Sequence, residues 1–191
     1  MNIRHTLGKI LYSIINIITL KKNNVKHNNF TINGIIKILN FGTLTLGDNF
    51  QANSGKNKNP IGGDTIARLI VFKKNAVLTI GENFRMSNST IVCWEKIEIG
   101  NNVMIGGSCK IWDTDFHSLI PDIRMANEED NDYKTAPIII KDNVFIGAGV
   151  IILKGVTIGE NSIIGAGSVV TGNVAENEIW AGNPARFIKS I

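Results

Sequence analysis

Aromatic residues, cysteine and histidine are all scarce in this chain of 191 residues. Aromatics make up 7% of it, and it holds two cysteines and three histidines. So few rings argue against a broad aromatic core and favour a narrow, repetitive fold. Cys93 and Cys109 form no CxxC pair and accompany no histidine cluster, so no zinc site is expected. Two buried, reduced thiols are typical of a cytoplasmic protein, which is the localisation we expect.

Long apolar runs are also missing. The run ILYSIINIITL at Ile10–Leu20 has 11 residues. As a helix it would measure roughly 16 Å, about half of a bilayer core near 30 Å. Lys21 and Lys22 follow it, rather than a small-residue cleavage site. We therefore expect neither a transmembrane helix nor a signal peptide.

Acidic residues are absent from the first 47 positions, which carry six basic residues. The net charge of the whole chain, +4, is too mild to indicate a nucleic-acid partner. Residues 1–28 are expected to form an apolar, helical segment. Such a segment can make peripheral contact with the inner membrane surface through its basic residues. It can also pack on its own domain or on a neighbouring subunit, and packing is the interpretation that we favour.

Isoleucine, asparagine and glycine are abundant, with 33, 24 and 19 copies. Aliphatic residues recur every six positions without a break at Ile140, Ile146, Ile152, Ile158, Ile164 and Val170. Shorter stretches of the same period are Ile99, Ile105, Ile111 and Ile80, Met86, Val92. Neither a helix nor a simple alternating strand sustains a period of six.

A coil of three short strands, six residues to a side, explains this period. The aliphatic residue of each hexad points inward, and Gly, Asn or Asp supplies the turn at each corner. A single coil has no closed core, so several must stack, and about seven fit between residues 30 and 175. The expected fold is an all-β parallel β-helix over residues 29–175. An irregular loop over 51–66 and an extended loop over 117–139 interrupt it, and residues 176–191 form a short cap.

His117 is the strongest candidate for chemistry. It stands where the next inward aliphatic residue after Ile111 would fall, at the mouth of the extended loop. A neutral imidazole there could act as a general base. Asp113 and Asp115 are close enough in sequence to orient its ring, and Asp115 is the one that we assign to the site. The alternative for both carboxylates is turn formation.

The C-terminal two thirds of the chain resemble the hexapeptide-repeat acyltransferases. The resemblance covers about residues 75–190 and is strongest in APIIIKDNVFIGAGVIILKGVTIGENSIIGAGSVVTGNV, followed by AGNPARFI. It is closest to the maltose and galactoside acetyltransferases and to the O-acetyltransferases of surface polysaccharides. It implies a left-handed β-helix, an exception to the usual right-handed crossover. It also implies a homotrimer with active sites between neighbouring prisms, and acetyl-CoA as donor.

The same resemblance implies roles for individual residues. His117 matches the catalytic base, and Asn88 matches an asparagine lining the acetyl and acceptor site, although asparagine at a corner is also ordinary turn chemistry. The implied cofactor-binding residues are Ala148 near the thioester, Ala166 and Thr171 along the pantetheine groove, and Arg186 and Lys189 near the nucleotide. Two positions depart from the pattern: Ala148 where Ser is common, and Gly172 where Lys is frequent.

The function expected from these residues is transfer of an acetyl group from acetyl-CoA to a sugar hydroxyl, in surface polysaccharide biosynthesis. N-acetylation of an amino sugar or a drug is the main alternative. A non-catalytic β-helical binding protein is another. A zinc carbonic anhydrase also uses this type of coil, but it needs three histidines at the metal, and His5 and His27 lie outside the clear hexads. No metal is expected.

Overall fold

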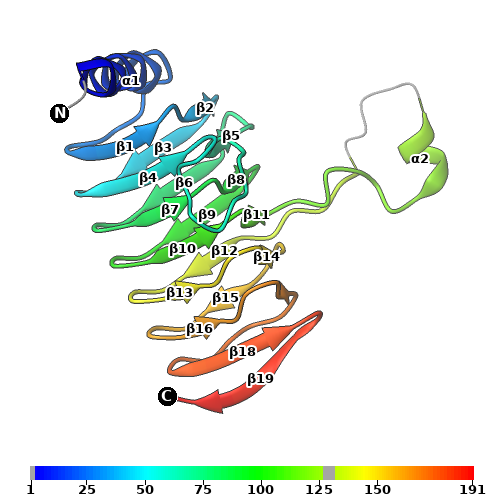
Figure 1. Cartoon of the computed structure of the whole chain (residues 1–191). Coiled ribbons are helices and arrows are strands. Elements are labelled where there is room, and N and C mark those ends of the chain that lie inside the picture. Colours follow the sequence, from blue (N-terminus) through cyan, green and yellow to red (C-terminus); the bar gives the residue numbers. More distant parts are fainter. Residues whose placement is uncertain (1–2, 127–131) are drawn as a thin grey trace.

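A three-sided prism of stacked strands forms most of the protein, with a helix across one end (Figure 1). The computed structural model describes residues 3–126 and 132–191. Helix α1 (Ile3–Lys22) precedes the prism, and a long excursion leaves its side and carries the short helix α2 (Pro121–Met125). The expected fold class, an all-β left-handed parallel β-helix, is confirmed.

Each side of the prism is one sheet, and the chain visits the three sheets in turn. The first sheet holds β1 (Phe30–Gly34), β4 (Phe50–Ser54), β7 (Arg85–Ser87), β10 (Met104–Gly107), β13 (Phe145–Ile146), β16 (Ile163–Ile164), β18 (Glu178–Gly182) and β19 (Ala185–Ser190). The second holds β2 (Lys37–Asn40), β5 (Arg68–Val71), β8 (Thr90–Cys93), β11 (Lys110–Trp112), β14 (Ile151–Ile152) and β17 (Val169–Val170). The third holds β3 (Thr43–Leu46), β6 (Val77–Ile80), β9 (Lys96–Ile99), β12 (Ile138–Ile140) and β15 (Thr157–Ile158). All neighbours pair in parallel except β18 and β19, a hairpin over part of the segment expected as the cap.

The hexad residues form the core, as the period predicts. The six residues from Ile140 to Val170 in the unbroken series are each at most 1% exposed. The prediction is wrong at Val92, which is half-buried, while its neighbours Ile91 and Cys93 are fully buried. The pairing of β7 with β10 shifts by one residue at this corner, so the inward residue comes five positions after Met86.

Both predicted interruptions have different bounds in the structure. The loop expected over 51–66 begins later, because residues 51–54 belong to β4 and pair with β1 and β7. Gln51 and Asn53 face outward and Ala52 and Ser54 face inward, as in a regular strand. The polar side chains made this strand look like a loop in the sequence. The excursion expected over 117–139 leaves the prism after Trp112 and returns at β12. Residues 127–131 of it lie outside the described part of the chain.

A ladder of asparagines runs along the corner between the third and first sheets, the asparagine corner. Each side-chain amide donates to the carbonyl oxygen of the next, over 2.9–3.1 Å. The ladder consists of Asn29, Asn49, Asn83, Asn102, Asn143, Asn161 and Asn177. All but the first have φ of 55–60°, a left-handed conformation that asparagine tolerates. Turn geometry and side-chain bonding together explain why asparagine recurs at this corner.

Helix α1 closes the N-terminal end of the prism. Asn16 is fully buried; its amide donates to the Gly34 carbonyl over 2.9 Å and its oxygen accepts from the Ile36 N–H. Leu20 is also fully buried and belongs to the core. The helix therefore supplies hydrogen-bond partners to backbone groups of the first coil that would otherwise have none. It also covers the end of the prism, where an uncovered strand edge could pair with another chain.

Candidate active site

Two corners of the prism carry the residues singled out from the sequence. The turns from the first to the second sheet form the glycine corner, with Gly106, Ala148 and Ala166. The turns from the second to the third sheet form the excursion corner, from which the chain leaves toward His117. One whole sheet separates the two corners within a single chain.

The glycine corner exposes backbone rather than side chains. A Cβ at Gly106 would lie 2.6 Å from the Ala148 nitrogen, and one at Gly147 would lie 2.6 Å from the Ala166 nitrogen. Glycine is therefore required where successive coils approach. The Gly147 N–H bonds the Ile164 carbonyl, but within residues 3–126 and 132–191 no group accepts a hydrogen bond from the Ala148 N–H. Ala148 itself is half-buried, which makes this N–H a candidate donor to an oxygen of a ligand.

An open groove of about 490 Å³ reaches Ala148 along the first sheet. The loop after β4 forms one wall through Asn59 and Ile61. Its lining includes Thr31, Asn33, Gln51, Asn53, Arg85, Met86, Ser87, Met104, Gly106, Gly107 and Phe145. Among the described residues that line it are amides, hydroxyls, one guanidinium and the apolar side chains of both methionines and Phe145, and none of these lining residues is a carboxylate. These groups suit a hydroxyl-rich ligand that is neutral or anionic.

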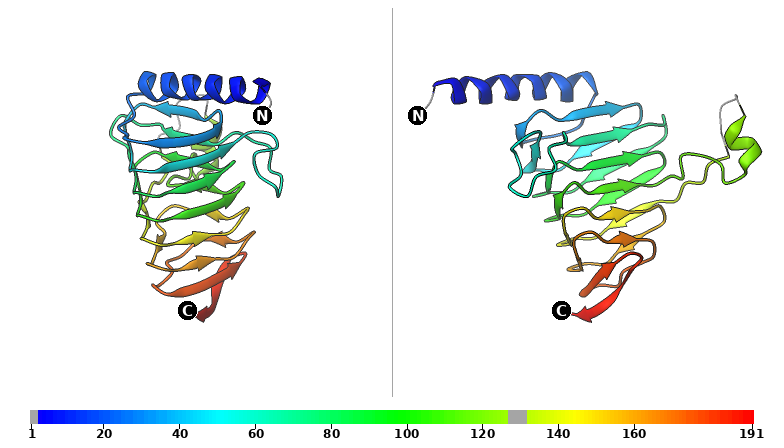
Figure 2. Two further views of the ribbon diagram at one scale, coloured as in Figure 1. Left: turned by 60° about the vertical axis from the view of Figure 1, so that its left-hand side comes forward. Right: turned by 45° about the vertical axis from the view of Figure 1, so that its right-hand side comes forward.

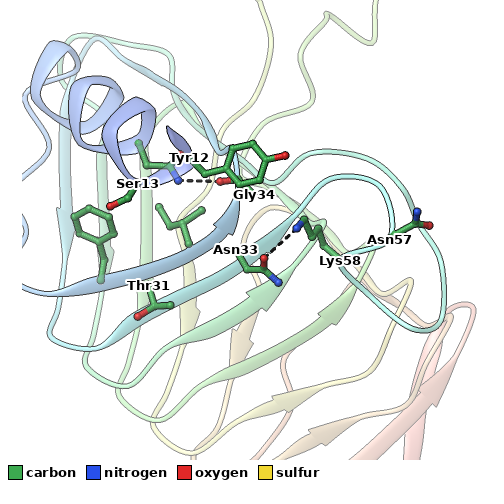
Figure 3. Close-up of a pocket in the computed structure, with 10 residues that line it drawn as sticks. Tyr12, Ser13, Thr31, Asn33, Gly34, Asn57 and Lys58 are labelled. Carbon is green, nitrogen blue, oxygen red and sulfur yellow. Dashed lines mark hydrogen bonds between the residues drawn. The ribbon is translucent and has the colours of Figure 1, made fainter. Parts of the chain in front are cut away.

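A second hollow, of about 610 Å³, continues this groove toward helix α1 (Figure 3). The two share Thr31 and Asn33 as lining residues. Lys58 points into this hollow; its ammonium group donates to the Asn33 oxygen over 3.1 Å and lies 5.5 Å from the centre of the Tyr12 ring. The path from the helix to Ala148 is therefore lined by amides and basic groups beside apolar and aromatic side chains.

Asn88 fastens the groove wall. It is 2% exposed, its oxygen accepts from the Gly55 N–H over 3.0 Å, and its amide donates to the Gly63 carbonyl. The Thr65 hydroxyl adds a bond to the Asn88 carbonyl. This side chain thus holds both ends of the loop after β4, and its place at the acetyl site stays a prediction.

Replacing Asn88 with alanine should release that loop. The Gly55 N–H and the Gly63 carbonyl would each lose one of two partners and keep only their bonds to the Thr65 backbone, and a buried hydrogen bond contributes about 0.5–1.5 kcal/mol. We expect trypsin to cut faster at Lys56 and Lys58 in Asn88→Ala than in the wild type. Asn57→Ala, in the same loop with an exposed side chain, is the matched control. Equal digestion of both variants would contradict the clamp.

His117 is exposed at the start of the excursion, not inward as its hexad position predicts. The chain has already left the prism at Trp112. Thr114 bridges Thr135 on the returning arm, and Phe116 takes a left-handed turn at φ 65°. The imidazole therefore stands outside the core at the base of a two-armed projection, where a substrate can reach it.

The two aspartates before His117 have separate partners. The carboxylate of Asp113 is fully buried and accepts from three consecutive backbone N–H groups, those of residues 94–96, over 2.7–2.8 Å. Asp115 forms an ion pair with Lys154 over 2.9 Å. Asp113 thus fixes the root of the excursion, and Asp115 joins it to the next coil. The orienting role assigned to Asp115 stays a prediction.

An aromatic cluster that the sequence analysis missed surrounds this root. Phe72 stacks on Trp94 with ring centres 5.0 Å apart, and Tyr133 on the returning arm meets Trp94 edge-on at 4.7 Å. The Lys73 ammonium lies 4.8 Å from the Trp94 ring centre and 5.0 Å from that of Tyr133. Aromatic pairs and cation–π contacts of this kind hold both arms against the prism. The signal available in the sequence was that Phe72, Trp94 and Asp113 follow three consecutive strands of one sheet.

The remaining cofactor candidates are exposed and lie at two places. Arg186 pairs across the terminal hairpin with Ala181, which contacts the end of the glycine corner at Gly165. Lys189 lies on the same strand. Thr171 follows β17 and so belongs to the excursion corner. The structure therefore groups Ala148, Ala166 and Arg186 along one edge and places Thr171 and His117 at another.

Neither cysteine is built for nucleophilic catalysis. Burial raises the pKa of both thiols, and the charge of Asp113 raises the pKa of Cys93 further. A raised pKa keeps a thiol protonated and unreactive at pH 7–8. We expect a disulfide reagent to find almost no thiol in the native protein and two per chain in guanidinium chloride. Rapid labelling of the native protein at pH 8 would contradict this.

Metal-binding clusters were searched for as groups of three or more His, Cys, Asp or Glu side chains. Among the residues that the structure describes, no such group occurs.

Part of the chain is similar in sequence to known acetyltransferases. The family model for the bacterial transferase hexapeptide (six repeats) matches residues 137–172. The galactoside O-acetyltransferase of Escherichia coli is 39% identical over 123 residues, 64% of this chain and 58% of that protein. The galactoside O-acetyltransferase of Lactococcus lactis is 41% identical over 104 residues, 54% of this chain and 48% of that protein. The chain thus spans about half the length of these relatives.

Solved structures extend the similarity over most of the chain. AntD, an N-acyltransferase from Bacillus cereus solved with dTDP and 3-hydroxybutyryl-CoA, is 26% identical with a TM-score of 0.67, covering 90% of this chain and 86% of that one. A maltose O-acetyltransferase from Clostridium difficile shares the fold at 24% identity, with a TM-score of 0.58, and covers 100% of this chain and 89% of that one. Hexads, prism and relatives agree: residues 137–172 match the hexapeptide repeat of bacterial transferases, and the chain is similar to hexapeptide-repeat acyltransferases in sequence and fold.

Proposed function

We propose that the protein transfers an acetyl group from acetyl-CoA to a hydroxyl of a sugar. One observation supports this most directly: an exposed histidine and an unpaired backbone N–H lie at different corners of the same prism, each beside open surface. The galactoside O-acetyltransferases, 39–41% identical to this chain, support the donor and the class of acceptor.

Because His117 and Ala148 lie at different corners of one chain, we infer that the active form is a homotrimer. His117 and Ala148 lie on opposite edges of the second sheet, so one chain cannot bring them to the same reacting atom. A cyclic assembly that sets the excursion corner of one copy beside the glycine corner of the next completes the site. Such heterologous contacts close into a ring when the rotation permits it.

The reaction then follows from the groups at these corners. His117 removes the proton of the acceptor hydroxyl as its oxygen attacks the thioester carbonyl, a contribution of about 10²–10⁴ in rate. The Ala148 N–H of the neighbouring copy holds the developing oxyanion, a kind of contact that contributes roughly 3–4 kcal/mol. The C–S bond breaks, the acetyl ester forms, and the imidazolium returns its proton to the thiolate of CoA. No acyl-cysteine is needed, in keeping with two buried thiols.

The other predicted residues bind the donor in this proposal. Ala166 and Thr171 line the pantetheine arm from either side of the interface, and Arg186 and Lys189 meet the phosphates of the nucleotide. Asp115, held by Lys154, fixes the segment that carries His117. The acceptor lies in the groove that ends at Ala148. A hydroxyl-rich sugar of a surface polysaccharide, built in the cytoplasm, suits its amide-lined wall.

N-acetylation is the second candidate, favoured by the similarity to AntD, an N-acyltransferase. An unprotonated amine is a stronger nucleophile than a hydroxyl and needs the base less. O-acetylation and N-acetylation can therefore be distinguished by whether a hydroxyl or an amine acceptor causes release of CoA from acetyl-CoA.

A thiol-release assay tests the proposal. Acetyl-CoA is supplied with mono- and oligosaccharides, amino sugars or chloramphenicol, and free CoA is followed with a disulfide reagent. Release with a hydroxyl sugar supports O-acetylation, and release with amines alone replaces it by N-acetylation. Absence of both release and acetyl-CoA binding would leave a non-catalytic β-helical binding protein. Light scattering checks the trimer.

A further inference from the structure

Helix α1 presents apolar side chains away from the protein. Ile10, Leu11, Ile14, Ile17 and Ile18 are each 50–58% exposed. Their spacing of one, three, three and one places them along one face of a helix. We call these five residues the isoleucine stripe. Asn16 and Leu20, which face the prism, are fully buried, so the stripe is the opposite face of the same helix.

Because α1 lies across the end of the prism, the isoleucine stripe forms an accessible apolar surface there. Both views of Figure 2 show α1 lying across the N-terminal end of the prism, and one shows it projecting beyond the strands. The stripe therefore faces outward at the end of the molecule. A planar partner can meet all five side chains at once.

Charge identifies the partner. The first 47 residues carry six basic residues and no acidic one, and Lys21 and Lys22 are exposed at the end of the helix. A second copy of this helix is a poor partner for the stripe, because the basic residues of the two copies would repel each other. An anionic surface complements them, and an apolar stripe with basic flanks is the pattern of helices that lie in the membrane interface. Among the described residues, no helix is long and apolar enough to cross a membrane.

We propose that the isoleucine stripe docks the protein on an anionic phospholipid bilayer, with α1 lying flat in the interface and the prism standing away from it. The hollow below α1, lined by Tyr12 and Lys58, then opens close to the headgroups. This docking depends on the stripe and not on the proposed acetyl transfer.

Vesicle co-sedimentation of the full chain without acetyl-CoA tests the proposal. Wild-type protein should sediment with phosphatidylglycerol–phosphatidylcholine vesicles and bind at least about tenfold more weakly to phosphatidylcholine alone or in high salt. Ile14→Gln with Ile17→Gln should weaken binding by about tenfold or more. Lys21→Gln with Lys22→Gln should reduce its salt dependence.

A matched control lies at the other end of the prism. Ile188 is 56% exposed, as much as the stripe residues, so Ile188→Gln should bind vesicles like the wild type. Failure of the wild type to bind, equal binding to neutral vesicles, or equal loss in Ile188→Gln would overturn the proposal. A smaller oligomer in Ile14→Gln with Ile17→Gln would overturn it too, because the stripe would then contact another copy. Thiol release with a soluble acceptor reports separately on the proposed function.

Discussion

Replacing His117 with alanine should lower kcat by about 10²–10⁴, because the acceptor hydroxyl loses its general base. Its exposed position means that the fold should be unaffected. The KM for acetyl-CoA should change little, since His117 is not among the groups proposed to bind the donor, which lie at the glycine corner, at the terminal hairpin and, for Thr171, at the excursion corner. Steady-state thiol release gives both constants.

His27→Ala is the control for this experiment. His27 is also exposed, and its ring contacts Phe30 of the first coil and the Asn28 carbonyl. It should keep wild-type turnover. If His117→Ala retained more than about a tenth of that turnover, the proposed base would be wrong.

Replacing Asp113 with alanine should cause the largest loss of stability. Three part-buried backbone N–H groups lose their acceptor, the buried Asp113 carboxylate, together, and each donor left unsatisfied costs about 1–3 kcal/mol. A loss of about 3–5 kcal/mol in the free energy of unfolding corresponds to a Tm lower by roughly 10 °C for a chain of this size. Guanidinium unfolding followed by circular dichroism measures the first, and a thermal scan the second.

Asp142→Ala serves as the comparison for that loss. Asp142 also accepts a backbone N–H, that of Asn101, but at an exposed corner where water can replace it. Its cost should be about 1 kcal/mol or less. Similar losses in both variants would mean that Asp113 is not the anchor of the excursion. Because that excursion carries His117, Asp113→Ala should also lower kcat in the protein that remains folded.

The core of the fold could be predicted from the sequence because one aliphatic position repeats every six residues. That rule locates inward residues from Ile140 to Val170, and it fails where a corner gains or loses a residue, as at Val92. It also overlooked the start of the loop after β4. Polar residues face solvent there, and only their pairing with neighbouring coils makes them a strand.

The site could be predicted less well, because its residues act across coils rather than along the chain. Spacing singled out His117 and the family resemblance singled out Ala148, but the spacing does not show that the two residues lie at different corners. It also treated Asn88 and Asp113 as turn or ring-orienting residues. Each of them bonds backbone groups of another coil, and no pattern within one hexad encodes that contact.

The asparagine ladder has a consequence for how this protein can change its length. Consecutive members are 16 to 41 residues apart in sequence, yet each reaches the next directly. Both large insertions, after β4 and after β11, leave from the other two corners. One residue added at the asparagine corner would break two amide bonds at once. Loops or grafted peptides should therefore be tolerated at the glycine and excursion corners, and the asparagine corner should stay closed to them.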